Sequence, residues 1–423
     1  MAEDLTDVAT TATPDQQLVY VNGLGLEPLY HITSPDNTVL LHLKALAGIG
    51  YDSNVYATNT DVQGSLFYEG VAGFDLSWAP SQKDVLLLSA DFDGMRYTAQ
   101  PGRNLAGGKA DFSYRHTAVD WDAGGEASFA RTNDPYIVTG QEIKHDDGHA
   151  GVDGFSRWSQ DGSGVRLAAT IDRTLYLEGA PGVFGKDDRN NTDFGGNARV
   201  GDVFAADSEV YARLGVDRRN YDESTFSQPI PIPGTDLLTT NGYNDSTGIT
   251  AVVGLRDKLG TRSGIIAEVG VIEREYANTF AQDPAFNDKH VARPEVNLAY
   301  KWDWEPGSEL GARAYSTVVD SVYSNAAWLY GAAVDARYRL SDEYKAALFG
   351  ELGVYQLKSS GNPGTTIQPD DEVRTTGEIS AGGEYVFHPG IGAQLKDVYD
   401  DSHSKYYNSF RRNVIEGELG FAF

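Results

Sequence analysis

The last stretch of the chain, from Asn413 to Phe423, alternates between two kinds of residue. Counting back from the end in steps of two gives Phe423, Phe421, Leu419, Gly417 and Ile415, and the residues between them are small or charged. A period of two places successive side chains on opposite faces of a β-strand, whereas a helix repeats every 3.6 residues. The segment is therefore predicted to be a strand with one apolar, aromatic face and one polar face.

This ending also resembles a known signal. Leu419, Phe421 and Phe423 match the C-terminal assembly signal of bacterial outer-membrane β-barrels, which end on an alternating strand with a final Phe. A soluble sheet with a free aromatic terminus on an edge strand would be prone to pair with other chains. The resemblance implies that the barrel-assembly machinery of the outer membrane is a partner.

The same alternation continues through most of the chain from Val39 onwards. Clear examples are Leu66 to Trp78, Val296 to Trp304 and Trp328 to Tyr338. Strands of soluble sandwiches are mostly about 3–10 residues long, whereas a tilted strand that crosses a bilayer needs about 9–11 residues in the hydrocarbon core alone. The long runs therefore favour a transmembrane barrel over a soluble sandwich.

The connections between these runs alternate in length. Short polar turns such as Ala79–Asp84 and Glu305–Ser308 alternate with longer segments, of which Asp222–Asp245 is the longest. Bacterial barrels have short periplasmic turns, long extracellular loops and an even number of strands, and the breaks here give about 18. We therefore predict an all-β, antiparallel transmembrane barrel over residues 39–423. Residues 1–38 are predicted to be an N-terminal extension that lies in the periplasm or inside the lumen.

Composition limits the class of protein further. The 423 residues carry a formal net charge of −27 and include no cysteine. Such an acidic chain is a poor partner for nucleic acid, and the lack of cysteine excludes disulfides, thiol catalysis and thiolate metal sites. No apolar run reaches the roughly 18 residues of a transmembrane helix, and Met1-Ala-Glu-Asp4 does not begin a signal peptide. We expect a mature protein of the bacterial outer membrane, in contact with lipid and lipopolysaccharide.

Charged side chains occupy the polar face of the predicted strands. The residues expected to line the lumen are Lys109, Asp111, Arg115, Arg166, Asp172, Arg213, Asp217, Glu268, Arg293, Glu295, Arg313, Asp335, Arg337, Glu351 and Glu384. Charges of both signs fit a hydrated channel whose wall selects solutes. They also fit a network of ion pairs that fills the interior, although a barrel of about 16–18 strands leaves an aqueous lumen unless a segment plugs it.

Aromatic residues are expected to form two belts at the membrane interfaces. An acidic residue followed by Tyr recurs towards the long loops, as in Asp93 to Tyr97, and we predict that Tyr97, Tyr176 and Tyr221 face lipid as an outer belt. Trp78, Trp302, Trp304 and Phe387 lie beside short turns and are predicted to form the inner belt.

The sequence offers little for catalysis or cofactors. It contains no Gly-x-Ser-x-Gly motif, and we expect no enzyme activity, cofactor or metal centre. His145-Asp-Asp-Gly-His149 is interpreted as a solvated outer loop. Acidic segments such as Lys186–Asp188 and Pro369–Glu372 offer oxygen ligands for loosely bound Ca²⁺ in the outer loops, but they lack the spacing of a calcium loop.

One family resemblance covers residues 39–423. The segment Ala47-Gly-Ile-Gly-Tyr-Asp-Ser-Asn-Val-Tyr-Ala57, the recurring Asp-to-Tyr strand ends and the Glu418-Leu-Gly-Phe-Ala-Phe423 ending are similar to the β-barrel porin 2 family. Several members of that family are associated with exopolysaccharide secretion. The resemblance implies an outer-membrane barrel, with periplasmic polysaccharide-export components as expected partners.

Three functions therefore remain open. The first is a conduit for a secreted polysaccharide or another hydrophilic substance. The second is a diffusion porin for small solutes, either general or selective. The third is a surface anchor or binding barrel with an occluded lumen, in which the long loops carry the function.

Overall fold

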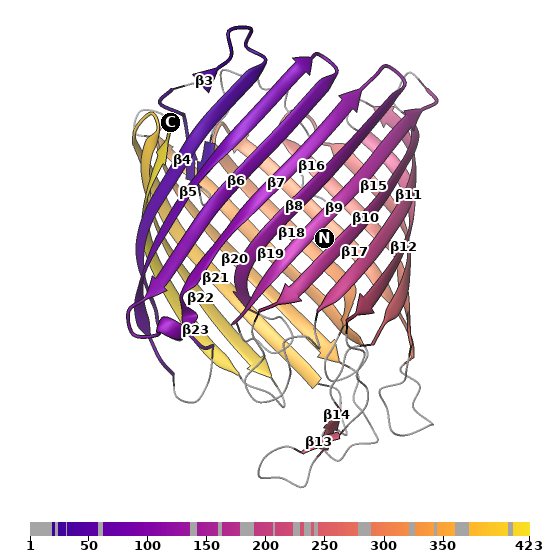
Figure 1. Cartoon of the computed structure of the whole chain (residues 1–423). Coiled ribbons are helices and arrows are strands. Elements are labelled where there is room, and N and C mark those ends of the chain that lie inside the picture. The colour runs from indigo at the N-terminus through magenta and orange to yellow at the C-terminus, as the bar shows by residue number, and fades with distance from the viewer. Residues whose placement is uncertain are drawn as a thin grey trace.

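The structure is a computed structural model (Figure 1) that describes most of the chain. The described residues are 19–21, 24–30, 32–57, 62–135, 142–159, 163–177, 190–205, 208–222, 229–231, 238–240, 244–277, 289–320, 326–341, 345–359, 372–404 and 409–423.

Eighteen long strands in this part of the chain form one closed antiparallel barrel. They are β4 (Val39–Asp52), β5 (Ser65–Ser81), β6 (Asp84–Tyr97), β7 (Leu105–Thr117), β8 (Trp121–Pro135), β9 (Glu142–Arg157), β10 (Gly164–Tyr176), β11 (Asn191–Ala205), β12 (Ser208–Tyr221), β15 (Ser246–Lys258), β16 (Ser263–Tyr276), β17 (His290–Glu305), β18 (Ser308–Asp320), β19 (Ala326–Ser341), β20 (Ala346–Ser359), β21 (Glu372–His388), β22 (Ile391–Ser404) and β23 (Phe410–Ala422). No helix among the described residues is long and apolar enough to span a membrane. The predicted fold class and strand number are confirmed.

Six short elements accompany the barrel. Two small hairpins are formed by β1 (Val19–Val21) with β2 (Leu24–Leu26) and by β13 (Pro229–Pro231) with β14 (Leu238–Thr240), and β3 (Ile32–Thr33) pairs with the start of β4. A single 3₁₀ turn covers Pro101–Arg103.

The two ends of the barrel differ as predicted. Short turns join the strands at one end, and the longer connections lie at the other (Figure 1). The turn between β17 and β18 consists of Pro306 and Gly307, and Gly307 has a φ of 80°, which glycine adopts without strain. The shift in strand register between Asp303 and Glu305 lies beside this turn, as β-bulges often do at barrel rims.

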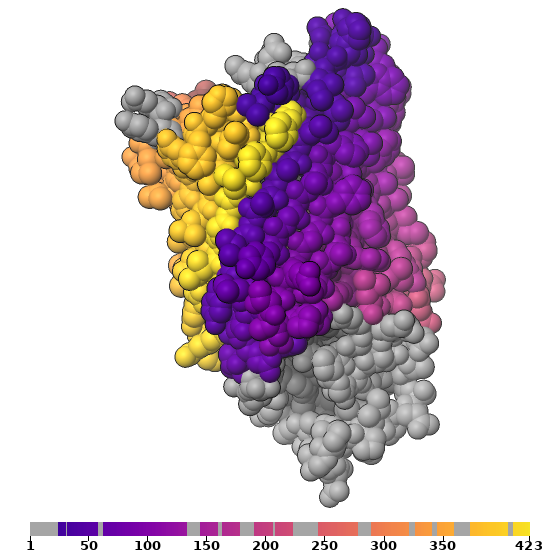
Figure 2. All heavy atoms as spheres, turned by 60° about the vertical axis from the view of Figure 1, so that its left-hand side comes forward, coloured from indigo at the N-terminus to yellow at the C-terminus, as the bar shows by residue number. Residues whose placement is uncertain are grey.

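The last strand closes the barrel against the first long one. β23 pairs with β4 from Val414 opposite Asp52 to Ala422 opposite Lys44, and Figure 2 shows these two ends of the chain side by side. The terminal Phe423 exchanges two backbone hydrogen bonds with Leu43, at 2.7 and 2.8 Å. The C-terminal residues therefore complete the ring of hydrogen bonds and leave no free edge.

The motif that begins at Asp52 explains part of this closure. The fully buried Asp52 carboxylate accepts a hydrogen bond at 2.7 Å from Arg412 of β23. Ser53 and Asn413 are joined by two hydrogen bonds, and the side chain of Asn54 donates to the carbonyl of Arg411. Asp52, Ser53 and Asn54 thus hydrogen-bond the long-loop end of β4 to β23.

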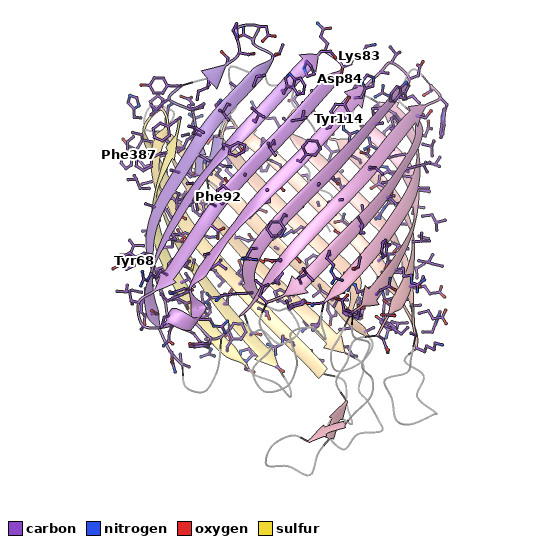
Figure 3. All side chains as sticks on the ribbon, in the orientation of Figure 1. Tyr68, Lys83, Asp84, Phe92, Tyr114 and Phe387 are labelled. Atoms are coloured by element: carbon purple, nitrogen blue, oxygen red, sulfur yellow. The ribbon has the colours of Figure 1, made fainter. Side chains whose placement is uncertain are left out.

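The two faces of the wall differ in chemistry. Large apolar side chains such as Phe92, Tyr68 and Phe387 project from the outer face (Figure 3), with exposed fractions of 69%, 52% and 58%. The polar side chains of the alternate positions point inward; for example, Lys44 forms ion pairs with Asp75 and Asp91 on the next two strands. An apolar exterior and a polar interior are what a bilayer requires of a barrel.

A matched pair of substitutions tests this assignment of faces. Leu214 lies in the middle of β12 on the outer face, and Asn197 lies on the inner face of the neighbouring strand β11. We expect Leu214→Arg to lower the free energy of unfolding in lipid vesicles by about 2–4 kcal/mol, because the charge enters the hydrocarbon core. Asn197→Arg is expected to cost much less, and urea unfolding of the refolded proteins measures both. Equal losses would show that the faces are assigned wrongly.

Candidate functional site

The interior of the barrel is the candidate site. Strand register places every predicted lumen residue on the inner face: Lys109, Asp111, Arg115, Arg166, Asp172, Arg213, Asp217, Glu268, Arg293, Glu295, Arg313, Asp335, Arg337, Glu351 and Glu384. Whether they select solutes stays a prediction.

Many of these charges are paired across strands. Arg313 of β18 forms an ion pair with Glu351 of β20, and Arg115 of β7 contacts Asp122 at 2.8 Å and Asp153 at 3.0 Å. The side chains nevertheless stay accessible to water: Arg313 is 57% exposed and Arg115 is 44% exposed. The described wall therefore has features of both predicted alternatives, the hydrated channel and the ion-pair network. Its charges form ion pairs, yet these side chains stay in contact with water.

The predicted outer belt is wrong. Tyr97, Tyr176 and Tyr221 face the lumen, where the hydroxyl groups of Tyr97 and Tyr221 donate hydrogen bonds to Asp52 and Asp320. The ring of Tyr176 lies 5.6 Å from that of His145. The physical reason is the period of two: residues four apart share a face, so a Tyr four positions after a lumen-facing acid also faces the lumen.

Other aromatic residues do lie on the outer face. Trp78, Trp302, Trp304 and Phe387 are found at the short-turn end, with Trp302 and Trp304 in ring contact at 5.8 Å. At the long-loop end, Tyr51 and Tyr68 are exposed on the outer face. Phe421 and Phe423 stack at 6.4 Å beside Leu419 at the short-turn end of β23.

The outer end of the β18–β19 hairpin bends into the lumen. β17 and β18 pair only as far as Val296 opposite Ser316, whereas β18 and β19 stay paired to Asp320. Pro294 lies just beyond this last pair and cannot donate a backbone hydrogen bond; its carbonyl instead accepts one from the hydroxyl of Ser316 at 2.9 Å. The end of the β18–β19 hairpin therefore separates from β17 at the point where Pro294 offers no backbone N–H group for pairing with β18.

Asp320 holds the bent end against distant strands. It accepts hydrogen bonds from Tyr221 and Arg219 of β12 at 2.6 and 3.0 Å, and from Tyr276 of β16 at 3.0 Å. Its side chain is 6% exposed. Since the three donors face the lumen, Asp320 must lie inside the barrel.

Apolar packing supports the same position. Val318 and Ala326 of the hairpin pack against Ile272 and Tyr276 on the inner face of β16. Ala327 and Leu329 pack with Tyr221 and Leu357. Both faces of the hairpin end are thus covered inside the barrel, and this end narrows the lumen near its outer mouth.

The N-terminal hairpin lies against the inner wall near the short-turn end. Leu24 and Leu26 are fully buried with Leu46 and Ala422, both on the inner face. They lie over Gly420 and Gly392, where a Cβ atom would come within 2.9 Å of a leucine methyl group. Of the two predicted positions for the extension, the described residues 24–26 therefore occupy the lumen.

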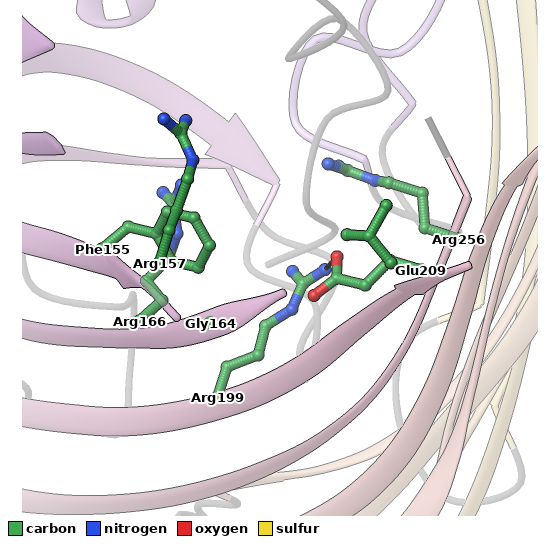
Figure 4. Close-up of a pocket in the computed structure, with 8 residues that line it drawn as sticks. Phe155, Arg157, Gly164, Arg166, Arg199, Glu209 and Arg256 are labelled. Carbon is green, nitrogen blue, oxygen red and sulfur yellow. Dashed lines mark hydrogen bonds and ion pairs between the residues drawn. The ribbon is translucent and has the colours of Figure 1, made fainter. Parts of the chain in front are cut away.

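A basic pocket lies on the wall formed by β9 to β15 (Figure 4). It has a volume of about 240 Å³, and its charged lining residues are Arg157, Arg166, Arg199, Glu209 and Arg256. Of these, only Arg166 is among the residues predicted from the sequence to line the lumen. Arg157, Arg199 and Arg256 have the same parity as lumen residues on their strands, which is the signal that would have found them.

Three carboxylates form the one group of possible metal ligands found among the described residues. Glu69, Glu416 and Glu418 bring oxygen atoms within 4.8 Å of one another where β5, β4 and β23 meet. Oxygen donors suit a hard cation, but Glu418 already accepts a hydrogen bond from Gln394. We assign no ion to this group.

His145–His149 is not a loop but part of β9, and the ring of His149 lies between Asp172 at 2.6 Å and Glu126 at 3.2 Å. That prediction is wrong because the segment continues the alternation of its strand. Residues 186–188 and 369–371, suggested for Ca²⁺, lie outside the described residues, as does most of the stretch from 222 to 245.

Comparison with known proteins gives one family match. The model of the family described as "Putative beta-barrel porin 2" matches residues 103–422. No curated protein matches the sequence.

Similar solved structures are outer-membrane proteins of low sequence identity. The outer membrane protein OpdK from Pseudomonas aeruginosa is 9% identical, with a TM-score of 0.48 over 90% of this chain and 99% of its own. OccK9 (OpdG) from the same organism is also 9% identical, with a TM-score of 0.48 over 90% of this chain and 98% of its own. The copper transporter OprC is 11% identical, with a TM-score of 0.44 over 97% of this chain and 84% of its own. At such identities and scores we draw nothing about substrates from them.

Proposed function

Because the chain belongs to the beta-barrel porin 2 family, and so is a bacterial outer-membrane barrel of the porin type, we propose that it is a selective diffusion channel for small hydrophilic solutes. The observation that carries this proposal is the inner face of the closed barrel, where charges of both signs stay accessible to water. A barrel of about 16–18 strands is wide enough for an aqueous lumen.

Two inward elements favour selection over general diffusion. The end of the β18–β19 hairpin narrows the lumen near the outer mouth, and the β1–β2 hairpin occupies part of it near the short-turn end. Charged side chains beside a narrowed passage act on a solute more strongly than in an open pore, because the solute must pass close to them.

The second candidate is a conduit for a secreted polysaccharide. The same two elements favour it, because a polymer exit must be closed until periplasmic export components engage it. In that case the N-terminal hairpin acts as a plug that the partner displaces. A surface anchor with an occluded lumen is the third candidate, and it depends on the long loops, most of which lie outside the described residues.

Planar-bilayer recording tests the first candidate. We expect the refolded full-length protein to give steady single-channel openings in KCl without any partner. Liposome-swelling assays should show entry of monosaccharides and small acids but exclusion of larger oligosaccharides, since the lumen is narrowed at two levels. A silent full-length protein in both assays would contradict the diffusion channel and leave the conduit or the anchor.

A further inference from the structure

We propose that the basic pocket on the β9–β15 wall is a binding subsite for the anionic group of a permeating solute, either a carboxylate or a phosphate, with Arg256 as its main ligand. The inference rests on the proposed function, since it names the solute class that the channel selects.

The pocket is open to the lumen and is built from consecutive strands. Strand register places Arg166 opposite Phe155 and Arg199, and places Glu209 opposite Arg256, all on the inner face. Figure 4 shows the side chains of these residues around a common space. A cavity of about 240 Å³ has room for a small organic anion or phosphate.

The charges at the pocket do not cancel. Four arginines line it against one glutamate, Glu209, which already accepts a hydrogen bond from Arg199. Asp153 pairs with Arg166 at 2.9 Å, but it also pairs with Arg115. Asp122 is shared in the same way, since it lies 3.8 Å from Arg157 and also pairs with Arg115. Among the described residues, and including Arg115, five arginines thus share three carboxylates, which leaves two positive charges in excess.

Arg256 accounts for part of that excess. It has neither a hydrogen bond nor an ion pair within the described residues, and its side chain is partly exposed to the lumen. Arg157 and Arg166 are held in place by cation–π contacts of 5.5 Å to the ring of Phe155. The guanidinium group of Arg256 therefore presents paired N–H donors beside those of Arg157 and Arg166. Paired N–H donors match the geometry of carboxylate and phosphate oxygens.

A purely structural role explains less of this arrangement. Arginines placed only to neutralise Asp122, Asp153 and Glu209 would not need Arg256. The excess of positive charge is also local, because the whole chain carries a net charge of −27. Rings or clusters of Arg are the usual means by which pores favour anions.

Equilibrium binding tests the proposal without depending on channel activity. Refolded wild-type protein, Arg256→Gln and Arg218→Gln are titrated in detergent with succinate and, separately, with phosphate by isothermal calorimetry. Arg218 is the matched control, since it lies exposed on the outer face of β12 and its loss changes the net charge equally. A difference in gel mobility between heated and unheated samples verifies that each barrel is folded.

We expect the wild type and Arg218→Gln to bind with equal affinity and Arg256→Gln to bind about tenfold more weakly, as for the loss of a charged hydrogen bond. Binding of succinate alone assigns the site to carboxylates, binding of phosphate alone assigns it to phosphates, and binding of both shows that charge decides. Absence of binding to the wild type, or equal weakening in both variants, overturns the proposal. A protein that binds these anions but is silent in bilayers would refute the diffusion channel and leave the subsite standing.

Discussion

Replacing Asp320 with alanine is expected to release the inward end of the β18–β19 hairpin and to raise the single-channel conductance. Asp320 is the acceptor that joins the hairpin to Tyr221 and Arg219 of β12 and to Tyr276 of β16. Without it, the hydroxyl groups of Tyr221 and Tyr276 lose this acceptor, and the hairpin end is held less tightly by its apolar contacts to β16. The passage at the outer mouth should then widen and fluctuate more.

The same change is expected to lower the free energy of unfolding by about 3 kcal/mol, because removing one partner from a buried ion pair leaves the other charge uncompensated. The loss is limited because Arg219 also pairs with Asp193, and Arg274, 4.0 Å from Asp320, also pairs with Asp217. Bilayer recording and urea unfolding in lipid vesicles measure the two effects.

Asp75→Ala is the control for this experiment. Asp75 forms an ion pair with Lys44 of the adjacent strand β4. Its loss therefore removes a carboxylate from the lumen but breaks no contact between strands that are distant in the barrel. We expect its conductance to match the wild type. Equal conductance in all three proteins would show that the hairpin end does not limit flow.

Removal of residues 1–38 is expected to have the second large effect. Leu24 and Leu26 are buried against Leu46 and Ala422 inside the barrel, so truncation should empty that part of the lumen and increase conductance. Barrel closure should persist, because the β23–β4 pairing does not involve these residues. Recording the truncated protein beside the full-length one measures the change.

The outcome also separates the two transport candidates. A modest increase over an already open channel supports diffusion of small solutes, whereas a silent protein that opens only after truncation supports a plugged conduit. A double variant, Leu24→Asp with Leu26→Asp, should reproduce the truncation, since two charges cannot stay in the buried apolar cluster. An unchanged conductance in both variants would mean that the hairpin lies against the wall without narrowing the path.

Much of the fold follows from local pattern. A period of two identifies each strand and sorts its residues between lipid and lumen, and all fifteen predicted lumen residues lie on the inner face. The alternation of short and long connections predicts both the order of the hairpins and the even strand number. These properties are readable because each depends only on neighbouring residues in the chain and on the bilayer outside.

The inward position of Tyr97, Tyr176 and Tyr221 also follows from the period of two. Asp172 and Tyr176 are four residues apart in one strand, so assigning the acid to the lumen required the tyrosine to be there as well. Tyr51 and Tyr68, which have the outward parity, lie on the outer face at the long-loop end.

The contents of the lumen were decided by the tertiary structure alone. Val318, Asp320 and Ala326 have the parity of lipid-facing residues, yet they are buried because their hairpin bends across the interior to β12 and β16. The basic pocket likewise brings Arg157, Arg166, Arg199 and Arg256 together from separate strands. The strands, their faces and the closed wall follow from the order of the residues alone, because alternation is a local property. Which side chains meet across the lumen depends on how the eighteen strands close into a barrel and on where the β18–β19 hairpin separates from the wall. Only the folded barrel brings strands that are distant in the sequence together.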